Sequence, residues 1–291
     1  MVSGEVLSDT LGISRVSIWK HIRKLQALGY RIDSTPKGYR LIDSPDAPFP
    51  WEFPGREGRM HYMPEVTSTM AVARDMARKG CPHLTVVVAD RQTQGRGRLK
   101  RRWLSDQGGL YFTTVLRPEI PIALTPRLNF LASLVLARTV QQLFHIDARV
   151  KWPNDILVKG KKLAGMLSEM EAEADLVNFV NIGIGVNVNN DPTDKEPGAT
   201  SLKNLGGKSF PRKKLLAGFL DAFEKRLDPL SLDTVISEWK RYTVTLNQPV
   251  RVVTRRETTE GIAVDLDDTG ALILRLPDGT QKKIVSGDCF Q

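Results

Sequence analysis

The amino-acid sequence predicts an α+β fold in three parts: a winged helix-turn-helix, a mixed sheet backed by helices, and a small SH3-like barrel. Three patterns support this prediction. Residues 1–44 are basic and helical in pattern, residues 51–242 alternate strand-like and helix-like runs, and residues 243–291 contain short strand-like runs between turns. The prolines of residues 43–50 oppose regular structure, so this segment is a linker. We therefore expect three domains with these bounds.

The composition limits the class of protein. At 291 residues with 41% hydrophobic side chains, the chain is long enough for two or three packed cores. The net charge of +9 favours acidic partners such as nucleotide phosphates, nucleic acid or an acidic protein. The only two cysteines, Cys81 and Cys289, give no disulfide framework, and the four histidines are too scattered to ligate a metal. The sequence shows neither a membrane-spanning apolar run nor a signal peptide, so we expect a cytoplasmic protein.

The first segment contains two predicted helices. Ser3 is suited to cap the first, and Ser14 to cap a second helix over residues 15–28, which Gly29 ends. The helical period places Ile18, Ile22 and Leu25 inward and Arg15, Lys20, Arg23 and Lys24 outward. Residues 31–34 and 38–42 are predicted to pair as a hairpin wing.

This pattern resembles a winged helix-turn-helix, which implies a DNA-binding face on the second helix. The residues expected to face the major groove are Ser14, Arg15, Ser17 and Lys20. The alternative is a packing module with a solvated basic face. A winged helix usually has another helix before this pair, whereas this chain begins at Met1, so we expect either a truncated start or a degenerate module.

The middle segment has the pattern of a largely antiparallel sheet covered by helices, because short turns join neighbouring strand-like runs. A helix over residues 70–80 follows a Thr-Ser-Thr cap and ends at Gly80. The other predicted helices are 125–144, 215–227 and 235–242, and the predicted strands are 84–89, 110–116, 149–158 with a Pro-Asn-Asp break, 162–170 and 176–189.

The last segment is predicted to form the barrel. Its strands are expected over residues 250–253, 261–266, 271–276 and 282–285, with turns at 267–270 and 277–280.

A basic glycine loop over residues 89–103 is the feature with the clearest chemical meaning. Gly95 and Gly97 permit a tight, deformable backbone, five arginines and Lys100 surround them, and Trp103 ends the run with a large apolar plane. Such a loop after a buried strand is suited to hold a charged, reactive small molecule. The alternatives are a solvated charge run or a patch that binds nucleic acid. A phosphate-binding P-loop is a weak alternative because the Gly-Lys-Ser/Thr ending is absent.

Four motifs in order, with both flanking modules, resemble a biotin–protein ligase of the larger class that carries an N-terminal winged helix. The motifs are the loop at 95–103, Lys-Trp-Pro-Asn-Asp at 151–155, Lys-Leu-Ala-Gly at 162–165 and Gly-Ile-Gly-Val-Asn at 183–187. The resemblance covers nearly the whole chain. It implies the biotin/lipoate ligase-like fold and a reaction of biotin with ATP that gives biotinyl-5′-adenylate. Biotin then passes to one lysine of a biotin carboxyl carrier protein, such as that of acetyl-CoA carboxylase.

The implied chemistry explains the residue types. Biotin carboxylate must attack the α-phosphate of ATP, so cations and a bound Mg²⁺ are needed to offset the repulsion of two anions. No covalent enzyme nucleophile is needed, which agrees with the absence of a Ser-His-Asp or Cys-His arrangement.

The resemblance assigns roles residue by residue. Biotin contacts are expected from Ser68, Thr69, Gln92, Gly95, Arg96, Arg98, Trp103, Gly165 and Gly183, although Ser68 and Thr69 also fit helix caps. ATP contacts are expected from Arg101, Lys151, Asn154, Lys162, Asn187 and Arg251. The catalytic set is Lys162, which bridges carboxylate and phosphate, Arg98, which retains the adenylate, and Asp155, which organises Mg²⁺. Without the motif, the alternative for Lys162 is an exposed lysine in a Gly-Lys-Lys turn with no function. The alternative for the Pro-Asn-Asp break is an ordinary turn.

Two positions depart from the family pattern. Lys100 stands where the family's loop usually has glycine, and Met70 stands where a polar residue is common after the Ser-Thr pair. Two rival functions remain open at this point: a lipoate–protein ligase, and a repressor that senses a ligand without ligase activity. Ligase and repressor activities can also coexist, with a homodimer on operator DNA and the adenylate as corepressor.

Overall fold

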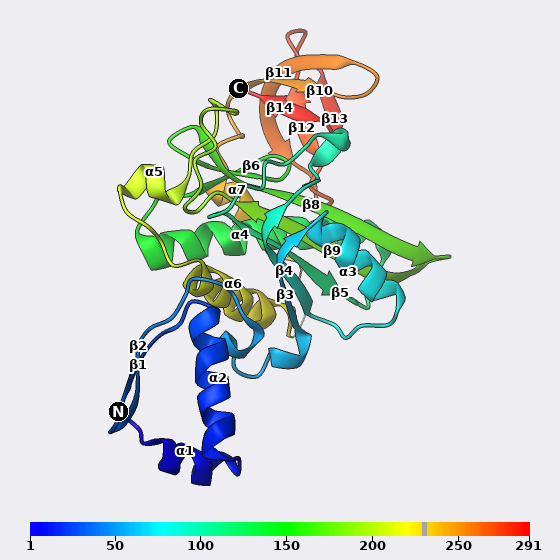
Figure 1. The fold of residues 1–291 in the computed structure, drawn as a ribbon. Helices are drawn as coiled ribbons and strands as arrows, with labels where there is room; N and C mark the ends of the chain where they lie inside the picture. Colours follow the sequence, from blue (N-terminus) through cyan, green and yellow to red (C-terminus); the bar gives the residue numbers. More distant parts are fainter. Residues whose placement is uncertain (229–231) are drawn as a thin grey trace. The chain divides into compact units, whose positions relative to one another are not determined.

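The computed structural model describes residues 1–228 and 232–291, which form two compact units, Met1–Ala47 and Pro48–Gln291 (Figure 1). The second unit contains both the predicted central segment and the predicted barrel. The bounds of three separate domains therefore stay predictions.

The first unit has the predicted helix pair and wing. Its elements are α1 (Gly4–Leu11), α2 (Arg15–Ala27), β1 (Arg31–Thr35) and β2 (Gly38–Asp43). Ser3 and Ser14 are the N-caps, and their hydroxyls accept from the amides of Val6 and Ser17. Gly12 turns the chain between the helices with a left-handed φ of 65°. The capping predictions are confirmed, and the second helix ends one residue earlier than expected, at Ala27.

The second unit is built on a seven-stranded sheet. Its order is β3-β4-β5-β9-β8-β7-β6, and only the pair β3–β4 is parallel. The strands are β3 (Met60–Val66), β4 (Thr85–Gln92), β5 (Leu110–Leu116), β6 (Arg149–Lys151), β7 (Asp155–Val158), β8 (Lys161–Glu173) and β9 (Leu176–Val186). The mixed, largely antiparallel sheet is confirmed. The strand expected over 176–189 ends at Val186, because the side chains of Asn187, Asn189 and Asn190 bond loop groups instead of extending the ladder.

Helices cover both faces of this sheet (Figure 1). They are α3 (Thr69–Arg78), α4 (Thr125–Phe144), α5 (Leu202–Gly206), α6 (Arg212–Leu227) and α7 (Val235–Tyr242). Short 3₁₀ turns are η1 (Pro50–Glu52), η2 (Glu57–Arg59), η3 (Arg98–Lys100) and η4 (Ile122–Leu124). The helix over 125–144 has the predicted bounds, whereas the helix expected from residue 215 begins three residues earlier, at Arg212.

Alternation along β5 assigns its side chains to two cores. Leu110, Phe112 and Leu116 join the large core with α4 and α6. There the rings of Phe112 and Phe219 meet edge to face with their centres 5.3 Å apart. Val115 points the other way, into a smaller cluster under α3. Each fully buried large side chain contributes about 1.5–3 kcal/mol. Both faces of the central strand are therefore fixed, which gives the adjoining loops a rigid base.

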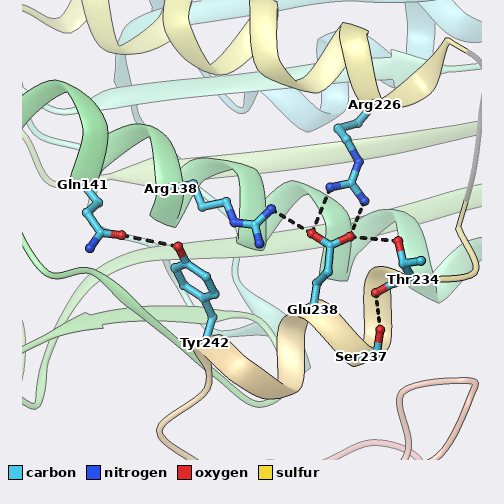
Figure 2. A network of polar contacts seen from close by, with 7 residues as sticks. All are labelled: Arg138, Gln141, Arg226, Thr234, Ser237, Glu238 and Tyr242. Carbon is cyan, nitrogen blue, oxygen red and sulfur yellow. Dashed lines mark hydrogen bonds and ion pairs between the residues drawn. The ribbon is translucent and has the colours of Figure 1, made fainter.

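A charged network joins α4, α6 and α7 (Figure 2). Glu238 of α7 accepts from Arg138 at 2.8 Å, from Arg226 at 3.0 and 3.2 Å, and from the hydroxyl of Thr234 at 2.8 Å. Burial raises the pKa of Glu238, but these hydrogen bonds outweigh it and lower the pKa to about 2. The carboxylate thus ties together three helices that are distant in sequence.

The C-terminal strands form a five-stranded antiparallel sheet in the order β13-β12-β11-β10-β14. They are β10 (Pro249–Val253), β11 (Thr258–Leu266), β12 (Leu272–Arg275), β13 (Gln281–Ile284) and β14 (Asp288–Phe290). Trp152 links this sheet to the larger one: its indole N–H donates to the Gly270 carbonyl, and its backbone N–H donates to the Thr245 hydroxyl, both at 2.9 Å. The predicted SH3-like fold is confirmed, with β14 as an additional strand.

Within the described part of the chain, every helix is too short or too polar to cross a bilayer.

Candidate active site

A cavity of about 360 Å³ lies where the β4–β5 loop, β8, β9 and the end of the barrel meet. It collects most of the residues that the sequence singled out, from segments far apart along the chain. The predicted residues on its wall are Ser68, Thr69, Gln92, Arg96, Arg98, Arg101, Trp103, Lys151, Asn154, Asp155, Lys162, Gly165, Gly183 and Asn187.

Two predicted residues are not among the described residues of the wall, Gly95 and Arg251. Gly95 lies behind it: a Cβ there would come within 2.5 Å of both the Ser105 hydroxyl and the Trp103 carbonyl. Arg251 is exposed and stacks on Phe290, with its guanidinium carbon 4.9 Å from the ring centre. Phe290 itself lines the cavity, so Arg251 contacts a residue of the wall, and its contact with ATP stays a prediction.

One end of the cavity is polar and deeply buried. Ser68 occupies the N-cap position of α3, yet its side chain makes no capping bond, and its hydroxyl has no hydrogen-bond partner. Only 2% of Ser68 is exposed. A buried, unpartnered hydroxyl costs free energy unless a ligand satisfies it. This observation favours ligand binding over capping as the role of Ser68.

Small residues form the floor of the cavity. A Cβ on Gly165 or Gly185 would come within 2.8 or 2.3 Å of the Trp103 indole, so glycine is what allows the ring to lie against β8 and β9. Gly183 has the same role for Met70, whose sulfur lies 2.6 Å from the position of a Cβ. Close approach of biotin at Gly165 and Gly183 stays a prediction, and the nearest protein groups at these positions are the Trp103 and Met70 side chains.

The charged end of the cavity centres on Lys162. Its Nζ lies 2.7 Å from Asp155 Oδ1 and 5.3 Å from the centre of the Trp103 ring. Hydrogen bonds on both sides hold its backbone, since the Lys162 amide donates to the Gly198 carbonyl and its carbonyl accepts from Thr200. Although the side chain follows a turn, it is directed at the cavity.

The basic loop folds back on itself as a small hairpin. The amide of Trp103 donates to the Gly95 carbonyl, and that of Gly97 to the Arg101 carbonyl. Arg98 reaches the barrel, where it donates to the Gly287 carbonyl at 3.0 Å, and burial lowers the pKa of its guanidinium. The guanidinium of Arg101 forms an ion pair with Asp288. The side chain of Lys100 lies outside the described residues.

Sequence reasoning missed several residues of the wall. They include Met166, Gly185, Glu196, Asp288, Cys289 and Phe290. Burial raises the pKa of the Cys289 thiol to about 11, so the thiol is neutral. Gly185 belongs to a motif that carried a signal, whereas nothing local marks β14 as part of a site.

The described residues contain no group of three or more His, Cys, Asp or Glu side chains that could hold a metal ion by themselves. Mg²⁺ in nucleotide sites is commonly bound by one or two carboxylates together with substrate phosphates. Asp155 lines the cavity beside Asn154, so this donor set fits an ion that arrives with a nucleotide. Such an ion would neutralise phosphate charge.

A cation-rich cavity on a mixed sheet, followed by an antiparallel barrel, defines the class of protein as one that handles a small anionic substrate together with a nucleotide. The family models specify it. The Biotin/lipoate A/B protein ligase family matches residues 62–189, the biotin protein ligase C-terminal domain matches residues 245–290, and an HTH domain matches residues 1–40. The chain belongs to the biotin protein ligase family.

Relatives and solved structures agree. The chain is 38% identical to the bifunctional ligase/repressor BirA of Bacillus subtilis, over 99% of this chain and 93% of that protein. A biotin protein ligase from Aquifex aeolicus in complex with biotin and ATP has a TM-score of 0.68 and 30% identity, over 80% of this chain and 97% of that one. The biotin protein ligase from Leishmania major in complex with biotinyl-5-AMP has a TM-score of 0.57 and 29% identity, over 78% of this chain and 99% of that one. The resemblance stated from the motifs is confirmed.

Proposed function

We propose that this protein is an ATP-dependent ligase that joins biotin to AMP and then transfers biotin to a lysine of a biotin carboxyl carrier protein. The single observation that carries the proposal is the convergence of Lys162, Arg98 and the unpartnered Ser68 hydroxyl on one cavity. One end is polar and buried, as a neutral head group requires. The other end is cationic, as a carboxylate beside phosphates requires.

In the first step a carboxylate oxygen of biotin attacks the α-phosphorus of ATP, and pyrophosphate leaves. Lys162 neutralises charge on both reacting groups, and Arg98, Arg101 and Lys151 attract the phosphates. Asp155 holds Lys162 in place and, with Asn154, faces the nucleotide-borne ion. Asn187, which is buried on the wall, contacts the base.

In the second step the acceptor amine attacks the carbonyl carbon of the mixed anhydride, and AMP leaves. Water would destroy this anhydride, so the loop with Arg96, Arg98 and Trp103 covers it until the carrier protein arrives. Gly95 begins this loop beside the biotin site, packed close to Ser105, and Thr69 and Gln92 complete the head-group end beside Ser68.

The test is incubation of the full chain with biotin, ATP, Mg²⁺ and an acceptor domain, followed by intact-mass spectrometry. We expect pyrophosphate release and the addition of one biotinyl group to one acceptor lysine. Lipoate in place of biotin is the control. Adenylation of lipoate but not of biotin would overturn the proposal in favour of the rival ligase.

A second role in DNA binding is favoured by the first unit. Arg15 and Lys20 are exposed along α2, and Ser14 and Ser17 lie at the start of that helix. We propose that these residues contact operator DNA, and that a homodimer with bound adenylate is the binding form. Fluorescence anisotropy with duplex DNA at several salt concentrations, with and without biotin and ATP, tests this. Lys20→Ala should weaken binding and flatten the salt dependence, and sedimentation measures the dimer.

A further inference from the structure

A buried chain of hydrogen bonds connects the polar end of the cavity with the loop that covers it. The Thr113 hydroxyl donates to the Thr69 hydroxyl at 2.9 Å, which donates to Gln92 Oε1 at 3.1 Å. Gln92 Nε2 donates to the Ser105 hydroxyl at 2.9 Å, which donates to the Trp103 carbonyl at 3.2 Å. The donors all run in one direction, from the sheet to the loop.

The orientation of the Gln92 amide is fixed within this chain. Its Oε1 accepts from both the backbone amide of Thr69, at 2.8 Å, and the Thr69 hydroxyl. The amide nitrogen must therefore face Ser105, and one of its two N–H groups is used there. Gln92 lines the cavity, so a ligand there can accept from the second N–H. A ligand that accepts from this N–H would thereby hold the bond to Ser105 in place.

Ser105 is the point where this chain meets the loop. Ser105 is only 5% exposed, and its backbone carbonyl also accepts a hydrogen bond from the backbone N–H of Gln92 at 3.2 Å. Gly95 packs against both the Ser105 hydroxyl and the Trp103 carbonyl, so a single hydroxyl contacts both ends of the loop. Trp103 in turn lies against Gly165 and Gly185 and beside the Lys162 ammonium.

We propose that Ser105 is a positioning residue that couples occupation of the head-group end to closure of the loop over the adenylate. The inference rests on the proposed function. With the Ser105 hydroxyl present, one group bonds both the Gln92 side chain and the Trp103 carbonyl, and the Trp103 indole stays packed against Gly165 and Gly185. Without it, Gln92 still binds the head group, but the Trp103 backbone loses its tie to that end. The expected defect is in retention of the adenylate, while biotin binding is preserved.

The chain offers a matched control in Ser133. Its hydroxyl donates to the Phe130 carbonyl at 2.9 Å and accepts from the Trp239 indole N–H at 2.9 Å, so it has the same pair of partners as Ser105: a backbone carbonyl and a side-chain N–H. Ser133 is fully buried in α4 and does not line the cavity. Ser133→Ala and Ser105→Ala therefore remove equivalent hydrogen bonds in different places.

The experiment loads each full-length variant with biotin, ATP and Mg²⁺, adds pyrophosphatase, and measures release of radiolabelled adenylate after filtration. Ser105→Ala should release the adenylate about fivefold to tenfold faster than the parent and label bystander lysines more, because one hydrogen bond that holds the loop is lost. Its biotin affinity should stay within about twofold of the parent. Ser105→Cys, which keeps the size but donates weakly, should fall between the two.

Ser133→Ala should lower the Tm by about as much as Ser105→Ala and retain the adenylate like the parent. Equal retention by Ser105→Ala and the parent would overturn the coupling. Equal leakage by both alanine variants would overturn it too, since the effect would then follow from lost stability. If the parent itself releases no pyrophosphate, the proposed function fails first, and the coupling with it. If the parent forms the adenylate but Ser105→Ala retains it as the parent does, only the coupling is overturned, and the proposed ligase activity is unaffected.

Discussion

The guanidinium of Arg101 forms an ion pair with the carboxylate of Asp288, which joins the basic loop to the last strand of the barrel. Arg98 bonds the carbonyl of the preceding residue, Gly287. Two loop arginines thus contact adjacent residues at the start of β14. Because Asp288 and Phe290 also line the cavity, the barrel forms part of the cavity wall and also binds the basic loop that covers the cavity.

The first prediction concerns this attachment. Asp288→Asn should speed tryptic cleavage within the loop, up to about fivefold at low salt, because an ion pair with one exposed partner contributes about 1 kcal/mol. Arg101 is 62% exposed, so added salt should screen the ion pair and bring the cleavage rate of the parent closer to that of the variant. Timed digestion followed by mass spectrometry measures this. Asp268→Asn, on an exposed turn of the same barrel, is the control, and equal rates for all three proteins would contradict the prediction.

Arg98→Gly should release the adenylate at least about tenfold faster, since the side chain both faces the cavity and bonds the Gly287 carbonyl. The measurement is biotinylation of a bystander protein without an acceptor sequence. Arg98→Lys keeps the charge but loses the planar donor group, so it should leak to an intermediate extent. A glycine variant that retains the adenylate as the parent does would remove this role from Arg98.

Lys162→Ala should lower adenylate formation about a hundredfold or more, because the cation that bridges carboxylate and phosphate is lost. Biotin binding, measured by calorimetry, should persist, since the ion pair and the ring contact of the Lys162 ammonium are with Asp155 and Trp103 and not with the head-group residues Ser68, Thr69 and Gln92. Lys161→Ala is the matched control, because Lys161 is the exposed neighbour on β8. Normal pyrophosphate release by the Lys162 variant would exclude that residue from the mechanism.

The network of Glu238 predicts a pH-dependent contribution to stability. Its pKa is lowered from 4.5 to about 2 in the folded protein, so the contribution is present above the unfolded pKa and is lost as the pH falls toward the folded one. Glu238→Gln should cost up to about 3 kcal/mol at neutral pH and less than half as much near about pH 3. Urea titrations of both proteins at several pH values measure this difference. A gap that does not narrow in acid would show that the carboxylate is not held in this way.

The fold was predictable where the pattern was strong and local. The helix over 125–144 is long and apolar, and its bounds were found to the residue. The pattern did not indicate β3, an edge strand in which a histidine and a proline interrupt the apolar residues, nor the five-residue α5 and three-residue β14. Elements this short are held by their neighbours rather than by their own propensity.

The site was predictable as a set of motifs but not as a set of contacts. Lys162 and Asp155 come from two separate motifs, and their ion pair arises from the pairing of β7 with β8. The parts contributed by tertiary structure alone, Asp288 above all, had no local signal. The packing of Gly95 against Ser105 likewise had no signal in the motif, and its contact with biotin stays a prediction.

The space above Gly183 is filled by the side chain of Met70, a flexible thioether that is almost fully buried. Met70 therefore limits the space above this strand from α3, where a side chain can be replaced without changing the backbone of the sheet. Shortening that group would make room for an enlarged vitamin analogue without disturbing the strands. This position is accordingly the natural starting point for an orthogonal labelling enzyme.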